Sequence, residues 1–428
     1  MFCFAMSTKI QSASSCADPF DPATISLADA LARIQDRVTQ VEGSERLPIR
    51  DCLDRINLAA IQSPMDVPAS PNSAMDGYAI SIDSLPADGV GEFSEIGTAY
   101  AGTPFNQTCG KLQCVRIMTG ALLPPGTDAV IMQEQAEVTA SGRVRIDSDH
   151  RVNENIRQAG EDIRTGETLL EAGARISPAD LGVLASLGIG ELDVVRKPVV
   201  AFFSTGDELV SIGEPLAAGK IYDSNRYSLY GMLSRLPVDI IDLGVIRDQA
   251  GAIREALLSA SQQADLIITT GGVSVGEADY IKPVLEEIGD TEFWKIAIKP
   301  GRPLTLGQID NSIFMGLPGN PVAVMVTFSQ FVIPAIQKLA GASVKAPMLF
   351  KARALDKMRK RPGRYEFQRG VATLDENNRW QVGKTGKQGS GILTSMSRAN
   401  CFIVLPDENA GVDIGDEIDI QFFDWSLG

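Results

Sequence analysis

The stretch Leu266–Tyr280, LIITTGGVSVGEADY, constrains the fold more than any other part of the chain. Leu266–Thr270 is short, apolar and rich in β-branched residues, which predicts a buried strand. Gly271 and Gly272 follow, and because glycine lacks a Cβ atom, the backbone there can take positive φ and approach a ligand closely. A helical run begins after Asp279. A glycine pair after a strand is often only a tight turn, but ligands of parallel α/β sheets do bind at such strand ends.

Three further apolar strands are predicted, at Pro198–Phe203, Val238–Val245 and Ser312–Gly316. Helical segments over about 225–235 and 249–262 lie between them. The resulting βαβαβα order predicts a central doubly wound α/β domain.

Acidic residues follow three of the predicted strands: Glu208, Asp248 and Asp279. In a parallel sheet they meet at one edge, where three carboxylates repel each other unless a cation or a proton offsets them. Mg²⁺ typically binds one or two carboxylates together with substrate phosphates. Each acid alone could equally cap the helix that follows it. The three together favour a metal site.

A basic cluster occurs in FWKIAIKPGRP, with Lys295, Lys299 and Arg302. If Phe293–Ile298 is a strand, the two lysines are an even number apart and share one face. Two ammonium groups beside a glycine turn suit a compact oxyanion. The alternative is a pair of exposed lysines on an edge strand. The apolar residues that alternate with the lysines favour the anion site.

The rest of the chain is rich in short strands. Residues 80–146 predict a β domain, and residues 347–425 predict a small β barrel. From spacing alone, Asp76-Gly77 favours a plain hairpin turn, and Thr119 ends a strand at a Thr-Gly turn. The basic run Lys357–Arg361 favours a solvated face over nucleic-acid binding. Arg364, which follows this run, could join an oxyanion site.

Composition excludes several classes of protein. The formal net charge of −15 argues against nucleic acid or an anionic membrane as the main partner. No apolar run approaches the ~20 residues of a membrane span. The six cysteines form no CxxC pair, which fits a reduced, cytoplasmic protein. The single histidine, His150, lies in a polar stretch and is expected to be solvated. Carboxylates, lysines and backbone groups therefore remain for any chemistry.

These patterns predict a multidomain protein with α/β and β parts. The expected parts are a disordered tail over 1–22, a linking domain with helices over 23–60 and 152–195, a β-rich domain over 61–151, the α/β domain over 196–345, and a β barrel over 346–428.

Seven motifs then occur in one order: SAMDGYA, RIMTGA, GEDI, STGDEL, TTGGVSVGEADY, KPGRP and GLPGNP. As a set they closely resemble the molybdopterin molybdenumtransferase family, which is related to the E domain of gephyrin. The resemblance covers the chain from about Thr24 to the C-terminus. It implies a magnesium-dependent insertion of molybdate into adenylylated molybdopterin, which releases AMP and gives molybdenum cofactor. It also implies an elongated homodimer with the active site between the α/β domain of one subunit and the β domain of the other.

The resemblance also implies roles for individual residues. The catalytic positions of the family correspond to Asp76, Thr119, Glu208, Asp248 and Asp279. Glu208, Asp248 and Asp279 would bind Mg²⁺, while molybdate would be held by Lys295, Lys299 and Arg302 or Arg364. The loops that would bind the molybdopterin substrate contribute Gly271, Gly272, Ser274, Pro318, Gly319, Asn320 and Pro321.

Two alternatives remain open. Molybdopterin adenylyltransferase shares the α/β domain, but the additional domains argue against it. A non-catalytic, gephyrin-like scaffold is disfavoured because the acidic and lysine positions are intact. Molybdopterin adenylyltransferase and proteins that mature molybdoenzymes are further expected partners.

Overall fold

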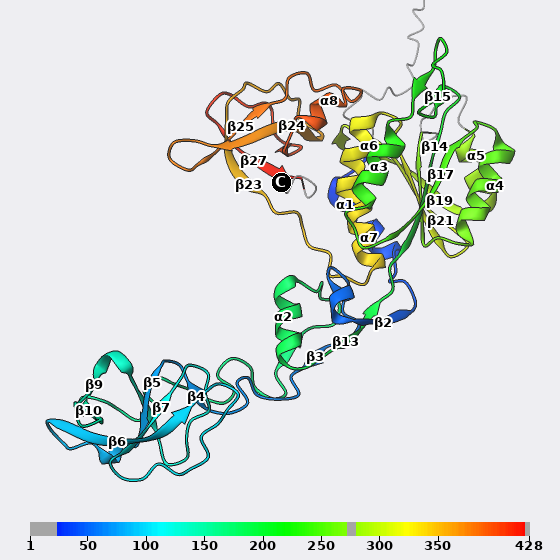
Figure 1. Ribbon diagram of the computed structural model, residues 1–428. Coiled ribbons are helices and arrows are strands. Elements are labelled where there is room, and N and C mark those ends of the chain that lie inside the picture. The colour runs from blue at the N-terminus through cyan, green and yellow to red at the C-terminus, as the bar shows by residue number, and fades with distance from the viewer. Residues whose placement is uncertain (1–23, 272–279, 424–428) are drawn as a thin grey trace, which may run out of the picture. The chain divides into compact units, whose positions relative to one another are not determined.

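The structure is a computed structural model of the chain, and it describes residues 24–271 and 280–423 (Figure 1). The chain forms two compact units. The large unit comprises Met1–Glu45, Asp54–Ile56 and Val194–Gly428, and the small unit comprises Arg46–Leu53 and Asn57–Asp193. The predicted tail over 1–22 lies outside the described residues.

A seven-stranded sheet forms the centre of the large unit. Its strands in spatial order are β1 (Thr24–Ile25), β19 (Asp290–Ile296), β21 (Pro303–Ile309), β22 (Ser312–Leu317), β18 (Leu266–Thr270), β14 (Val199–Thr205) and β17 (Asp239–Ile246). Neighbours from β17 to β22 are parallel, whereas β21 is antiparallel to both β22 and β19. The predicted strands are therefore present, and β18 has the predicted bounds.

Helices cover both faces of this sheet (Figure 1). One face carries α1 (Leu27–Arg37), α3 (Asn225–Leu233), α6 (Pro321–Thr327) and α7 (Ile333–Leu339), and the other carries α4 (Ala250–Ser261) and α5 (Ile281–Ile288). Successive residues of a strand point to opposite faces. Accordingly, Phe202 packs in the first core and Phe203 in the second. The doubly wound α/β fold is confirmed.

The segment Pro321–Leu339, from α6 through a π-helical turn (Phe328–Val332) to α7, is long and apolar enough to cross a membrane by length and composition alone. The expectation that no apolar run approaches the length of a membrane span was therefore wrong. Two thirds of it, 67%, is buried inside the large unit. That burial identifies it as a core helix of the α/β sheet.

The C-terminal part of the large unit is a closed barrel. Its strands are β23 (Phe350–Ala354), β24 (Tyr365–Leu374), β25 (Trp380–Lys384), β26 (Cys401–Leu405) and β27 (Glu417–Phe422), with a short helix α8 (Thr394–Ser397). The barrel closes because β24 pairs with both β25 and β26. The short strand β20 (Ile298–Lys299) leaves the α/β part and pairs with β24. Phe367 and Phe402 of the barrel belong to the same hydrophobic core as α6 and α7, so the two parts are packed together.

The small unit contains a six-stranded sheet in the order β8 (Ala129–Met132), β5 (Gly77–Ile80), β7 (Gln113–Ile117), β6 (Val90–Ala99), β10 (Arg143–Asp147) and β9 (Ala136–Val138). Two small antiparallel pairs join β3 (Ile61–Gln62) to β12 (Thr168–Leu170) and β4 (Asn72–Ser73) to β11 (Ile156–Arg157). Helix α2 (Pro178–Ser186) starts at a capping box in which Ser177 and Asp180 exchange hydrogen bonds. Of the remaining strands, β2 (Ser44–Pro48) pairs with β13 (Glu191–Val195), whereas β15 (Leu209–Val210) and β16 (Ile221–Tyr222) form a two-stranded sheet of the large unit.

Two sequence-based expectations differ from the structure. Helix α1, which we assigned to the linking domain, buries Ala30 and Ile34 in the core of the large unit. Asp76-Gly77 is not a hairpin turn, because β4 and β5 on either side of it belong to different sheets. The other domain boundaries stay predictions.

Candidate functional site

The predicted acidic edge is partly formed at the carboxyl end of β14. Asp248, which follows β17, accepts a hydrogen bond from the Thr205 hydroxyl through Oδ1 at 2.7 Å. The carboxylate of Glu208 folds back onto Gly206, where a Cβ atom would lie 2.6 Å from Glu208 Oε2. Both carboxylates therefore lie at the turn that ends β14, and Asp248 is held there by its hydrogen bond. The third predicted ligand, Asp279, lies outside the described residues.

Within residues 24–271 and 280–423, no group of three or more His, Cys, Asp or Glu side chains is arranged to hold a metal ion. The two placed acids nevertheless have the right chemistry for Mg²⁺, which needs one or two carboxylates when substrate phosphates supply the other ligands. The hydrogen bond from Thr205 uses one of the acceptor sites of the Asp248 carboxylate, so other sites remain for a ligand.

The glycine turn after β18 approaches its neighbours closely. Gly271 has φ +90°, and a Cβ atom on it would lie 2.5 Å from the Thr205 carbonyl oxygen. A Cβ atom on Gly319 would lie 3.8 Å from the Gly271 Cα. Glycine is therefore required at 271 on both conformational and steric grounds. Gly272 and Ser274 lie outside the described residues.

The predicted loop Pro318–Pro321 lies beside this turn and is fixed from two sides. The Asn225 side chain donates from Nδ2 to the Gly319 carbonyl oxygen at 2.7 Å. The Val322 N–H, at the start of α6, donates to the Ser390 carbonyl oxygen of the barrel at 3.0 Å. Gly319 and Asn320 themselves are exposed, so their backbone groups are accessible to a ligand.

The basic cluster differs from its predicted geometry. The predicted strand Phe293–Ile298 is interrupted, so Lys295 lies in β19 and Lys299 in β20. Lys295 pairs with Pro303 of the α/β sheet, whereas Lys299 pairs with Glu366 of the barrel. The chain leaves one sheet for the other at Ala297, which is why the single-strand argument was wrong.

A cavity of about 540 Å³ lies at the barrel beside Lys299. Its lining residues are Lys299, Arg359, Lys360, Arg361, Pro362, Arg364 and Glu366. Two predicted anion ligands, Lys299 and Arg364, are thus brought together. The other two are not among the described lining residues: Lys295 lies in β19, and Arg302 is buried with its guanidinium donating to Thr24.

Sequence reasoning missed most of this cavity. The run Lys357–Arg361 is not a solvated face throughout, since Lys360 is only 7% exposed. Its Nζ donates to the carbonyl oxygens of Asp407 and Asn409 at 3.2 and 2.9 Å. Burial lowers the pKa of Lys360. The signal in the sequence was the apolar Met358 within the run, which the structure buries at 1% exposure and which does not fit a fully solvated face.

The other predicted residues lie in the small unit. Asp76 Oδ1 accepts hydrogen bonds from both the backbone N–H and the hydroxyl of Thr119, each at 2.7 Å. The backbone bond and then the hydroxyl bond lower the pKa of Asp76. Asp66 and Thr165 form the same arrangement, at 2.7 and 2.8 Å. We call each an Asp–Thr clamp. The duplication shows that a clamp can simply join two loops.

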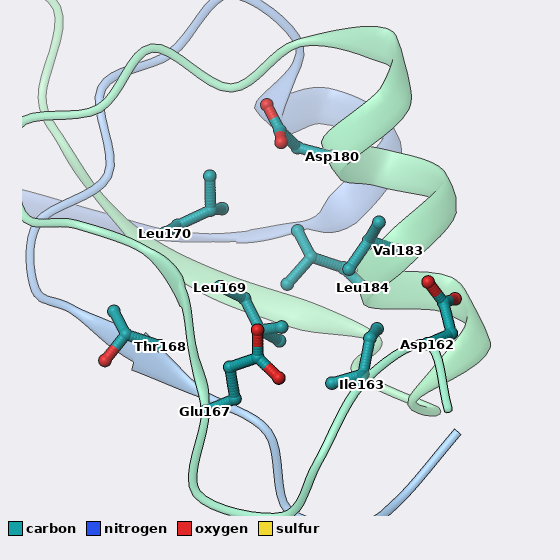
Figure 2. A pocket seen from close by; sticks show the side chains of 9 residues that line it. All are labelled: Asp162, Ile163, Glu167, Thr168, Leu169, Leu170, Asp180, Val183 and Leu184. Carbon is teal, nitrogen blue, oxygen red and sulfur yellow. The ribbon is translucent and has the colours of Figure 1, made fainter. Parts of the chain in front are cut away.

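Besides the cavity of the large unit, a pocket of about 200 Å³ lies in the small unit (Figure 2). Its floor is apolar, with Leu170 and Leu184, and Asp162, Glu167 and Asp180 contribute carboxylates. Asp162 belongs to the GEDI motif, although we did not predict it as a site residue.

The side chain of His150, expected to be solvated, is 6% exposed, and its Nδ1 lies 3.2 Å from Glu154 Oε1.

Three family descriptions match the chain along its length. "MoeA N-terminal region (domain I and II)" matches residues 25–188, "Probable molybdopterin binding domain" matches 201–338, and "MoeA C-terminal region (domain IV)" matches 351–423.

Named relatives and solved structures are similar over nearly the whole chain. A molybdopterin molybdenumtransferase of Haemophilus influenzae is 43% identical over 405 residues, which is 94% of this chain and 100% of the relative. One of Staphylococcus aureus (strain COL) is 32% identical over 92% of this chain and 95% of its own length. The crystal structure of a molybdopterin biosynthesis moeA protein from Pyrococcus horikoshii OT3 superposes with a TM-score of 0.80 at 29% identity, covering 94% of this chain and 100% of that one.

Proposed function

This chain belongs to the molybdopterin molybdenumtransferase family and has a role in molybdenum cofactor biosynthesis, and from that premise we propose its reaction in detail. The proposed reaction is insertion of molybdate into adenylylated molybdopterin with release of AMP. The observation that carries it is the cavity beside Lys299. The protein has a formal net charge of −15. Nevertheless, five basic side chains line this cavity: Lys299, Arg359, Lys360, Arg361 and Arg364. Such a local excess of positive charge suits a small dianion such as molybdate.

The proposed roles follow from the positions of the side chains. Lys299 and Arg364 bind molybdate, because both line the cavity. The exposed Gly319–Asn320 backbone, fixed by Asn225, contacts the molybdopterin substrate at the sheet edge. Lys295 and Arg302 remain proposed contributors on the resemblance alone, as do Gly272, Ser274 and Asp279, which lie outside the described residues.

Glu208 and Asp248 would hold Mg²⁺, with Thr205 orienting Asp248. When bound, Mg²⁺ would withdraw negative charge from the phosphoanhydride as it breaks. An oxygen of molybdate or water would form a bond to the AMP phosphorus, while the bond from that phosphorus to the bridging oxygen of the phosphoanhydride breaks and the molybdopterin phosphate leaves with that oxygen. A covalent nucleophile from this chain is not required.

The reaction is tested by incubating the purified full-length protein with adenylylated molybdopterin, molybdate and Mg²⁺ and measuring AMP. We expect AMP release that depends on molybdate. Lys299→Ala should raise the molybdate KM at least about tenfold, which corresponds to ~1.4 kcal/mol of binding, whereas the exposed Lys345→Ala should not. AMP release without molybdate, or none at all, would contradict the proposal and favour the adenylyltransferase or scaffold alternatives.

We also propose that the protein acts as a cytoplasmic homodimer. Several large apolar side chains between residues 212 and 230 are exposed in the large unit: Ile212, Leu216, Ile221, Tyr222, Tyr227 and Tyr230. Apolar side chains left exposed in this number are typical of a surface that a partner covers. Light scattering of the full-length protein should give twice the chain mass, and Tyr230→Asp should reduce it. A wild-type monomer would refute the dimer.

A further inference from the structure

One carboxylate lies among the cations of the Lys299 cavity. The side chain of Glu366 is 8% exposed, and its Oε1 accepts hydrogen bonds from Lys299 Nζ at 2.9 Å and from Gln368 Nε2 at 3.1 Å. Among the described residues that line the cavity, Glu366 is the only acid. A carboxylate weakens the binding of any anion placed near it. A cavity selected only for tight anion binding would therefore exclude this residue.

The charge of Glu366 acts on several of the surrounding cations. Burial lowers the pKa of Lys360, and Glu366 is the first group that opposes this effect. Burial also lowers the pKa of Arg369 to about 10, again opposed by Glu366. Arg369 is 1% exposed, and its side chain donates to Ser395 Oγ and the Gly389 carbonyl oxygen, both uncharged groups. Glu366 is thus a shared counter-ion for the cavity and for the barrel beneath it.

The contact with Lys299 is compatible with a bound anion. An ammonium group has three N–H donors. One is used by Glu366, and the Lys299 side chain is still 48% exposed, so its other donors can reach a ligand. An anion that binds to Lys299 is separated from the Glu366 carboxylate by the Lys299 ammonium group alone. Lys299 is held in place by Glu366, and the anion is held less tightly than it would be by Lys299 alone.

We propose that Glu366 is a positioning residue that fixes Lys299 while lowering the affinity of the cavity for molybdate, so that the bound anion can leave for the second substrate. This role rests on the proposed function. Tight binding of a substrate in its ground state does not accelerate a reaction and slows any step in which that substrate must leave its first contacts. A weakened site suits an anion that is passed on.

The test compares Glu366→Gln with Glu376→Gln in the full-length protein, because Glu376 is an exposed residue in a turn of the same barrel. Calorimetry with molybdate alone gives Kd, and AMP release gives KM and kcat. For Glu366→Gln, we expect Kd and KM for molybdate to fall about tenfold and kcat to fall as well. Glu376→Gln should leave all three unchanged. Unchanged or weaker molybdate binding in Glu366→Gln, with a normal urea-unfolding midpoint, would overturn the proposal.

Glu366→Asp covers the case in which Glu366→Gln does not fold. It retains the charge and should keep Kd within about threefold of the wild-type value, so a tenfold decrease would overturn the proposal. The two proposals fail separately. If the wild type releases AMP but Glu366→Gln binds molybdate no more tightly, only the role of Glu366 is lost. If the wild type releases no AMP but Glu366→Gln binds molybdate more tightly, only the proposed reaction is lost.

Discussion

Replacing Gly271 by alanine should damage both the fold and the site. Gly271 has φ +90°, where an L residue is strained by about 1–2 kcal/mol. Its new Cβ atom would lie 2.5 Å from the carbonyl oxygen of Thr205, which is backbone and cannot rotate away. Moving one strand end to relieve such overpacking typically costs about 1–3 kcal/mol. The two costs sum to about 2–5 kcal/mol of unfolding free energy, a large share of the ~5–15 kcal/mol of a typical domain.

The matched control is Gly251→Ala in α4, in the same unit. A Cβ atom at Gly251 meets nothing within 4 Å, and its φ is not positive. Alanine in a helix is favoured over glycine by about 0.5–1 kcal/mol, so this variant should be neutral or slightly more stable.

Urea unfolding monitored by tryptophan fluorescence measures both variants, since Trp294 is buried in the same sheet. AMP release should fall for Gly271→Ala even where it remains folded, because Thr205 also orients Asp248. A loss of less than about 1 kcal/mol for Gly271→Ala, with AMP release equal to that of the control, would refute the steric reasoning.

Three further predictions follow from the site and the small unit. Chelation with EDTA should abolish AMP release, and added Mg²⁺ should restore it. Glu208→Gln should raise the Mg²⁺ concentration needed for half-maximal activity about tenfold, whereas the control Glu214→Gln, at an exposed position, should not. An equal effect of the two substitutions would remove Glu208 from the metal site. The Asp76–Thr119 clamp lowers the pKa of Asp76, so its stabilising effect should be complete above the unfolded pKa of about 4 and lost as pH falls through the lower folded value. The protection factor of the Thr119 amide, which is its hydrogen-exchange rate relative to the intrinsic rate at the same pH, should therefore fall in acid in the wild type and be low at all pH values in Asp76→Ala. A protection factor that does not change with pH in the wild type would contradict this. Burial raises the thiol pKa of Cys114 and Cys401 to about 12, so peptide mapping should find both unlabelled by iodoacetamide at mildly alkaline pH until the protein is denatured.

The sequence predicted the α/β sheet well because its central strands, β14, β18 and β22, are buried on both faces. Such strands form continuous apolar runs, and Leu266–Thr270 has no exposed position in the structure. The turn residues after the strands are also local features. Gly271 and the Pro318–Pro321 loop were therefore identified correctly as strand-end turns.

The cavity was harder to predict because it depends on contacts distant in sequence. Lys299 meets Glu366 across 67 residues, and alternation within FWKIAIKPGRP contains no information about a change of sheet at Ala297. The burial of Lys360 likewise depends on the carbonyl groups of residues 407 and 409. Local periodicity cannot report such pairings, and the roles of Lys299 and Arg364 in binding molybdate stay predictions.

The shared core of the barrel and the α/β layer limits how the anion can enter. Phe367 and Phe402 belong to the same hydrophobic cluster as Phe328 and Phe331 of the core helix. Separating the two parts would expose these rings to water, at about 25 cal/mol for each Å² uncovered. This cost disfavours a hinge motion that would separate the barrel from the α/β part. If the cavity binds molybdate as proposed, the anion enters past the side chains that line it, and its entry rate should depend on the motions of Arg359, Arg361 and Arg364.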